Sequence, residues 1–117
     1  MKLNKNNAGL DAEYAAATFL QSKGLKLIAQ NYHCRFGEID LVMQDGKTLV
    51  FVEVRMRSNA AFGGAASSIT PQKQQKLTLT AQHYLQKHGN QLCRFDVVLM
   101  SDKQAEQIEW ITNAFSA

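Results

Sequence analysis

Two apolar, β-branched runs flank the dipeptide Asp45-Gly46, and this feature most restricts what the chain can fold into. An Asp-Gly pair between two alternating segments is a strong short-range signal for a β-hairpin with a two-residue type I′ turn. Residues 37–57 are therefore predicted to form one hairpin, with Gln44 paired to Lys47 across the turn. Because successive side chains of a strand point to opposite faces, the two sides of this hairpin can be compared residue by residue.

One face of the predicted hairpin gathers three carboxylates and a guanidinium. Counting from the turn places Glu38 opposite Glu53 and Asp40 opposite Phe51, with Arg55 on the same face. Like charges that face each other destabilise a sheet, and a bound cation would explain the cluster. The alternative is a set of solvated charges on an exposed sheet face, salt-bridged by arginines.

The opposite face of the hairpin is entirely apolar and is expected to be covered by helices. Its members are Ile39, Leu41, Met43, Val50, Val52, Val54 and Met56. A first helix is predicted over residues 7–23, ending before Gly24. Its expected buried stripe is Tyr14, Ala15, Thr18 and Phe19, with Glu13 at the margin.

The remaining segments complete an α/β pattern. Thr70 and Pro71 are typical of a helix start, and this second helix is expected to end at Gly89. Further strands are predicted over residues 25–30, 92–100 and 108–112, and a loop over 58–68. The order α-β-β-β-α-β-β indicates a mixed β-sheet flanked by helices, and 117 residues fit a single domain spanning 1–117.

Composition indicates the cellular location and the kind of partner to expect. No apolar run approaches the roughly 18 residues needed to span a bilayer, and the first residues lack the apolar core of a secretory signal. Cys34 and Cys93 are far apart and read as reduced thiols, so a cytoplasmic protein without a membrane partner is expected. The formal net charge of +3 leans mildly towards polyanionic partners.

The carboxylates also suggest a chemistry. Mg²⁺ takes oxygen ligands from one or two carboxylates together with water and substrate phosphates. A cation beside a positive side chain is suited to hydrolysis of a phosphodiester, because both stabilise the developing negative charge. A zinc site built from His33, Cys34, His83, His88 and Cys93 is the weaker alternative, since no pair has finger-like spacing.

An ordered set of motifs resembles a known family. The set comprises Glu13, GEIDL at residues 37–41, FVEVR at 51–55 and TPxK at 70–73. Together these resemble the YraN-like family of small bacterial proteins, a branch of the PD-(D/E)xK superfamily. The resemblance implies a restriction-endonuclease-like fold and metal-dependent nuclease activity on DNA, including branched or damaged DNA.

The resemblance also implies roles for individual residues. Asp40 and Glu53 take the positions of ligands for Mg²⁺ or Mn²⁺, and Glu13 that of an assisting carboxylate on the first helix. Arg55 stands where the superfamily usually has lysine. An arginine keeps the positive charge but not the compact ammonium, so Arg55 is expected to favour holding phosphate over activating water.

Basic side chains near these motifs are candidates for contact with nucleic acid. They are Arg35, Arg57, Lys73 and Lys76, with Arg55 beside them. Neutralisation of backbone phosphates by Lys and Arg is the main source of nucleic-acid affinity. Two hypotheses follow: a metal-dependent DNA nuclease, or a non-catalytic nucleic-acid-binding protein that retains the nuclease fold.

Overall fold

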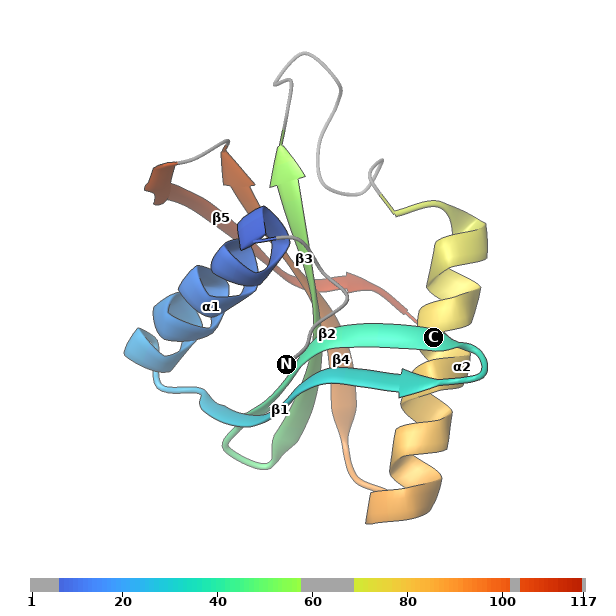
Figure 1. Cartoon of the computed structure of the whole chain (residues 1–117). Helices are drawn as coiled ribbons and strands as arrows, with labels where there is room; N and C mark the ends of the chain where they lie inside the picture. The colour runs from blue at the N-terminus through green and yellow to red at the C-terminus, as the bar shows by residue number, and fades with distance from the viewer. Residues whose placement is uncertain (1–6, 58–68, 102–103, 117) are drawn as a thin grey trace.

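The computed structural model describes residues 7–57, 69–101 and 104–116. These form a five-stranded sheet with two helices, in the order α1 (Asn7–Ser22), β1 (Lys26–Cys34), β2 (Gly37–Asp45), β3 (Thr48–Arg57), α2 (Pro71–His88), β4 (Cys93–Ser101) and β5 (Gln104–Phe115) (Figure 1). The strands follow one another across the sheet, with β3 and β4 parallel and the other neighbours antiparallel. The predicted α/β class and element order are confirmed. The predicted loop over 58–68 lies outside the described residues.

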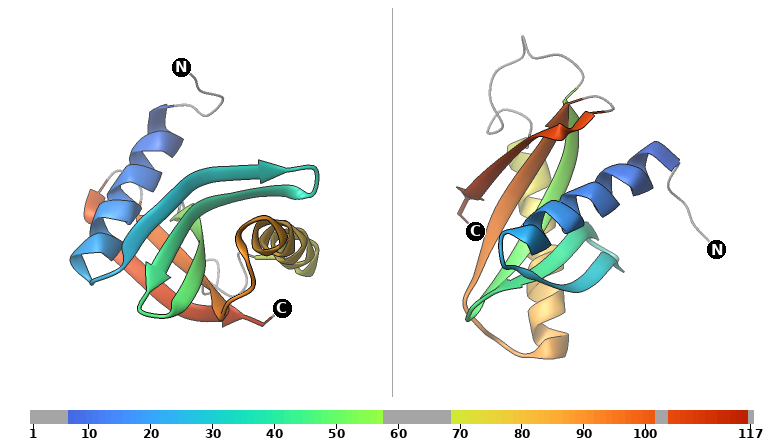
Figure 2. Two further views of the ribbon diagram at one scale, coloured as in Figure 1. Left: turned by 90° about the horizontal axis from the view of Figure 1, so that it is seen from below. Right: turned by 90° about the vertical axis from the view of Figure 1, so that its left-hand side faces the viewer.

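Both faces of the sheet are covered, α1 lying on one and α2 on the other (Figure 2). Under α1, the core includes Leu41, Met43, Val50 and Val52, as the apolar face of the hairpin predicts. Under α2, it includes Val42, Leu49 and Phe51, and the candidate carboxylates Asp40 and Glu53 are also buried. The alternative of a solvated carboxylate face is therefore wrong at the centre of the sheet. None of the described helices is long and apolar enough to cross a membrane.

Helix α1 is rotated relative to the prediction. Tyr14 is 72% exposed, whereas Ala12, Ala16, Ala17 and Leu20 are buried against the sheet. Small alanine side chains allow the helix backbone to approach the strands closely. The face of α1 that contains the alanines is therefore packed against the sheet, and the face that contains Tyr14 is turned towards solvent. Glu13 is consequently buried and does not lie at the margin of the stripe.

The hairpin forms with a register different from the predicted one. Asp45 pairs with Thr48 and Val42 with Phe51, so the two-residue turn is Gly46-Lys47. Gly46 has φ 59°, and a glycine at the first central position is the requirement of a type II′ turn. The partner of each residue moves by two positions, which preserves the faces. The predicted opposition of Glu38 and Glu53 is wrong, because Glu38 pairs with His33 of β1.

Strand β2 leaves β3 just beyond this hairpin. The paired residues of β2 and β3 end at Leu41 and Val52, and the β1–β2 hairpin then bends across towards α2 (Figure 2). Ile39 and Val42 are three residues apart yet pack in the same core under α2. The two-residue alternation of the strand is therefore broken between them, and Asp40 lies at this break.

Helix α2 begins and ends as predicted. The Thr70 hydroxyl accepts a hydrogen bond of 3.1 Å from the backbone N–H of Lys73, and Pro71 is the first helical residue. At the other end, the N–H of Gly89 donates to the carbonyl of Leu85. Leu77, Ala81 and Tyr84 of α2 are buried, Leu85 is half-buried and His88 is exposed.

Gly37 is expected to be intolerant of a side chain. Its φ of 150° is a conformation that residues with a Cβ rarely adopt, and a Cβ there would meet Thr80 Oγ1 at 3.4 Å. We expect Gly37→Ala to lower the free energy of unfolding by about 1–3 kcal/mol, the usual cost of such backbone strain. Urea denaturation at one pH measures the change, and an unaltered transition midpoint would contradict it.

Candidate active site

Asp40 and Glu53 are buried carboxylates that meet where β2 separates from β3. They are 6% and 7% exposed. Asp40 Oδ2 accepts a hydrogen bond of 2.9 Å from the backbone N–H of Val54, the residue that follows Glu53. This bond ties the carboxylate of β2 to β3 at the point where the ladder between the strands has ended. The structure thus brings the two predicted metal ligands together.

The environment of Glu53 disfavours its ionised form. Its neighbours around a small internal space include Ile39, Phe51 and Leu77. Burial, and secondly the charge of Asp40, raise the pKa of Glu53 to about 7, although Lys73 and Arg55 act in the opposite direction. A carboxyl group whose pKa is raised this far by burial and by a neighbouring charge is typical of functional sites.

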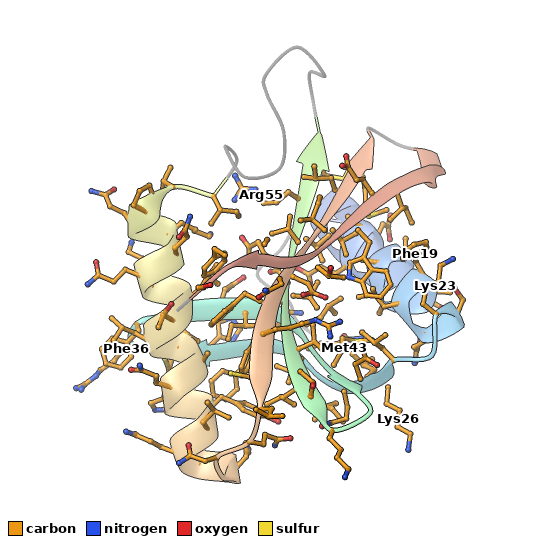
Figure 3. All side chains as sticks on the ribbon, turned by 180° about the vertical axis from the view of Figure 1, so that it is seen from behind. Phe19, Lys23, Lys26, Phe36, Met43 and Arg55 are labelled. Carbon is orange, nitrogen blue, oxygen red and sulfur yellow. The ribbon has the colours of Figure 1, made fainter. Side chains whose placement is uncertain are left out.

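Two cations from different elements converge on one oxygen of Glu53. Lys73 Nζ, from the first turn of α2, lies 3.2 Å from Glu53 Oε2, and Arg55 NH1 lies 3.5 Å from the same atom. Figure 3 shows Arg55 near the start of α2. Both cationic side chains remain partly exposed, at 40% and 37%, so each can also reach solvent or a ligand.

The sequence places Lys73 in the TPxK motif and among the nucleic-acid-binding candidates, but it does not predict the ion pair of Lys73 with Glu53. The contact of Lys73 with the site follows from the parallel pairing of β3 and β4, which a prediction of the sheet order would have to include. A parallel pair requires a crossover, and here α2 is part of that crossover. Because Thr70 and Pro71 fix the start of α2, Lys73 lies in the first turn of this helix, where its ammonium reaches Glu53 of β3.

Glu13 is buried on the helix face that packs against the opposite side of the sheet from α2. Within the described part of the chain, no group of three or more Asp, Glu, His or Cys side chains is arranged to hold one ion. A cation bound by Asp40 and Glu53 would therefore take two protein carboxylates. A role for Glu13 in positioning water stays a prediction.

The pair fits a hard divalent cation. Mg²⁺ usually keeps several waters and binds one or two carboxylates together with substrate phosphates, which matches two adjacent carboxylates. The candidate zinc ligands are dispersed: His33 Nε2 pairs with Glu38 Oε1 at 3.1 Å, and His83 contacts the Tyr32 hydroxyl. Cys34 and Cys93 are free thiols, Cys93 being exposed.

Another buried carboxylate, Asp96, gives a useful contrast. It accepts hydrogen bonds from Arg94 Nε at 3.0 Å, Trp110 Nε1 at 2.9 Å and the backbone N–H of Asn113 at 2.9 Å. These donors use both of its oxygens and join β4 to β5. Asp96 is therefore a structural carboxylate that joins two strands, whereas Glu53 pairs with two partly exposed cations and lies near enough to Asp40 for that charge to raise its pKa.

The other predicted basic residues lie in different places. Arg35 and Lys76 line a groove between the β1–β2 turn and α2. The side chain of Arg57 lies outside the described part of the structure. Of the predicted nucleic-acid contacts, only Lys73 is placed beside the carboxylates among the side chains that the structure describes.

Comparison with known proteins assigns the family. The model of the uncharacterised protein family UPF0102 matches residues 12–100, most of the chain. The chain belongs to UPF0102. It is 62% identical over 109 residues to a UPF0102 protein of Methylobacillus flagellatus, covering 93% of this chain and 96% of the relative. It is also 59% identical over 110 residues to one of Nitrosomonas europaea, covering 93% of each.

A further UPF0102 protein, from Saccharophagus degradans, is 54% identical over 114 residues, covering 95% of this chain and 94% of the relative. The YraN-like resemblance is thereby confirmed. The segment matched by the UPF0102 model contains Glu13, Asp40, Glu53, Arg55 and Lys73. Because the family description names no activity, any function must be argued from the site itself.

Proposed function

We propose that this UPF0102 protein is a metal-dependent nuclease that hydrolyses phosphodiester bonds of DNA. The observation that carries the proposal is the buried pair of Asp40 and Glu53, with Lys73 and Arg55 both within ion-pairing distance of Glu53. Two like charges in a low-dielectric site are unfavourable unless a cation is shared between them. Burial and the charge of Asp40 still raise the pKa of Glu53 with Lys73 and Arg55 beside it, which supports binding of a further cation at this pair.

The roles divide by charge and position. Asp40 and Glu53 would hold Mg²⁺ or Mn²⁺, which supplies Lewis acidity towards a phosphoryl oxygen and lowers the pKa of a bound water. The planar guanidinium of Arg55 is suited to a bidentate grip on phosphate oxygens. Lys73 provides the compact ammonium that the superfamily usually places at the position of Arg55, here from a helix and not from the strand.

The start of α2 supports a polyanionic substrate. Its first turn contains no acidic residue, and Lys73 and Lys76 both lie in the first two turns. Cations near a helix N-terminus are unfavourable, because the helix dipole is already positive there. An anion bound at this end would relieve the unfavourable arrangement, and a DNA phosphate is such an anion.

A non-catalytic nucleic-acid-binding protein is the second candidate. The observation that favours it is that both cations already neutralise Glu53, so that the site carries little net charge to attract a metal ion. In that case Lys73 and Arg55 would contact phosphate, and the carboxylates would only position them. The two candidates differ in whether any DNA is cleaved.

Cleavage of a substrate panel distinguishes the candidates. We expect the protein to cut at least one of linear, nicked, flapped and four-way DNA in Mn²⁺ or Mg²⁺, and Asp40→Asn to reduce the rate by about 10²-fold or more through loss of a metal ligand. Asp45→Asn is the matched control, because Asp45 lies on the same strand but pairs with Arg94 at the surface. A folded parent that cuts none of these substrates would favour the binding protein. Equal rates for the parent and Asp40→Asn would overturn the site assignment.

A further inference from the structure

A groove of about 540 Å³ lies between the β1–β2 turn and the exposed side of α2. Its walls are formed by Arg35 and Phe36 from the turn and by Gln72, Gln75, Lys76 and Leu79 from the helix. Figure 3 shows Phe36 beside the middle of α2 and Arg55 near the start of that helix. The groove is separate from the carboxylates but shares a helix with the site through Lys73.

The fold holds the two walls in place. Cys34 pairs with Gly37, which leaves Arg35 and Phe36 as a two-residue turn, and the N–H of Phe36 donates to Cys34 Sγ at 3.4 Å. A Cβ at Gly37 would lie 3.4 Å from Thr80 Oγ1 and 3.9 Å from Lys76 Cβ, which is van der Waals distance from α2. The turn is therefore docked against the helix, and the groove is a built feature of the fold.

The side chains of the groove suit a nucleotide. None of the six described residues that line it is acidic, and two are cationic. The guanidinium carbon of Arg35 lies 4.9 Å from the centroid of the Phe36 ring, so a cation and an aromatic ring, both able to stack on a base, lie together at this turn. Proteins that bind single-stranded nucleic acid combine such stacking groups with cations that track the backbone, because every base has a stacking face.

Helix α2 contributes Lys76 to the groove and Lys73 to the candidate active site. Lys76 follows Lys73 by three residues, a rise of about 4.5 Å along the helix axis. A DNA strand whose phosphate lies at Lys73 could therefore place the next phosphate near Lys76 and its base near Phe36. The amides of Gln72 and Gln75 offer donors and acceptors for a base edge.

We propose that this groove binds an unpaired nucleotide of the substrate, and that the protein acts on DNA with a single-stranded segment. The adjacency to the reacting phosphate rests on the proposed nuclease function, but the binding itself does not. A base can stack on a protein side chain only when it is not already stacked and paired within a duplex, so duplex DNA cannot use this contact. The substrates favoured by this geometry are flapped or otherwise partly unpaired DNA.

Binding of fluorescein-labelled oligothymidylate, followed by anisotropy in EDTA, tests the proposal without cleavage. Phe36→Leu removes one base–aromatic stack and is expected to bind oligothymidylate about tenfold more weakly than the parent. Phe36→Tyr keeps an aromatic ring and should bind it as tightly as the parent. An oligonucleotide with abasic sites should bind the parent and Phe36→Leu equally, as should duplex DNA. Tyr14→Leu is the control, since Tyr14 is an aromatic residue 72% exposed on α1.

Lys76→Gln tests the backbone contact separately. It should weaken binding of normal and abasic oligonucleotides alike and reduce the slope of log affinity against log salt by about one. Lys87→Gln, an exposed lysine in the last turn of α2, should leave both unchanged. If Lys87→Gln has the same effect as Lys76→Gln, the attraction is a general charge effect and the groove assignment is overturned.

The outcomes separate this proposal from the proposed function. Weak or absent binding of oligothymidylate by the parent, or Phe36→Leu binding as tightly as the parent, would overturn the groove and leave cleavage untouched. An equal loss on normal and abasic strands would show that Phe36 does not stack on a base. Conversely, if Phe36→Leu weakens binding as expected but the protein cuts no DNA, nucleotide binding in the groove is supported and the proposed nuclease activity is wrong.

Discussion

The metal-free protein is expected to lose stability as pH rises from about 4.5 to about 7, and Glu53→Gln is expected to remove most of this loss. Glu53 has an unperturbed pKa of 4.5, and burial beside Asp40 raises the pKa in the folded protein to about 7. The folded state therefore binds this proton more tightly than the unfolded state. The stability that it contributes is full below pH 4.5 and is lost as pH rises through 7.

The size of the effect follows from the pKa shift. Each pKa unit corresponds to 1.36 kcal/mol, so this carboxyl costs about 3 kcal/mol of unfolding free energy at pH 8 relative to pH 4.5. Glu53→Gln cannot ionise, so at pH 8 it should be more stable than the parent by up to about 3 kcal/mol, with little difference near pH 5. Urea denaturation in EDTA across this range measures both curves.

Divalent metal supplies the control for this prediction. A cation that binds only the folded state stabilises it by mass action, by about 2.7 kcal/mol at one hundred times the dissociation constant. Mn²⁺ at pH 8 should therefore stabilise the parent and not Glu53→Gln. Parallel pH curves for the two proteins would show that Glu53 does not titrate as described, whatever the effect of metal.

The hairpin shows what a local pattern can predict and where it stops. The apolar alternation on both sides of Asp45-Gly46 was sufficient to predict two antiparallel strands, and Asp40 and Glu53 lie close together in the structure. The predicted type I′ turn at Asp45-Gly46 is wrong, because a glycine also satisfies the first central position of a type II′ turn, and Gly46 takes that position. The resulting shift of two residues kept the faces, so the candidate pair survived an incorrect register.

Other parts of the site depend on packing that no local pattern records. Alternation predicts a solvated partner face for an antiparallel hairpin, but α2 covers that face and buries Glu53. The buried side of α1 was predicted from its large side chains, whereas close packing on the sheet selected its alanines. Each error arose where two elements distant in sequence meet, which is also where the site is built.

Replacing Lys73 by glutamine is expected to reduce metal-dependent cleavage by about 10²–10³-fold, the usual effect of removing one group that stabilises the transition state. Lys73 is the cation nearer to Glu53 Oε2, at 3.2 Å against 3.5 Å for Arg55, and its ammonium is compact enough to lie beside a carboxylate and a phosphate together. Arg55→Lys keeps a cation on the strand and is expected to change the rate much less. Single-turnover rates in Mn²⁺ compare the variants.

The pH profile distinguishes a catalytic from a merely structural Lys73. Its charge lowers the pKa of Glu53, so Lys73→Gln should raise that pKa further and move the acidic limb of the rate profile to higher pH. Lys73→Arg should restore the position of the limb by restoring the charge, even if the rate recovers only in part. Lys87→Gln at the far end of α2 should change neither. If Arg55→Lys loses more activity than Lys73→Gln, the strand cation is the essential one, and the assignment of the ammonium to α2 is wrong.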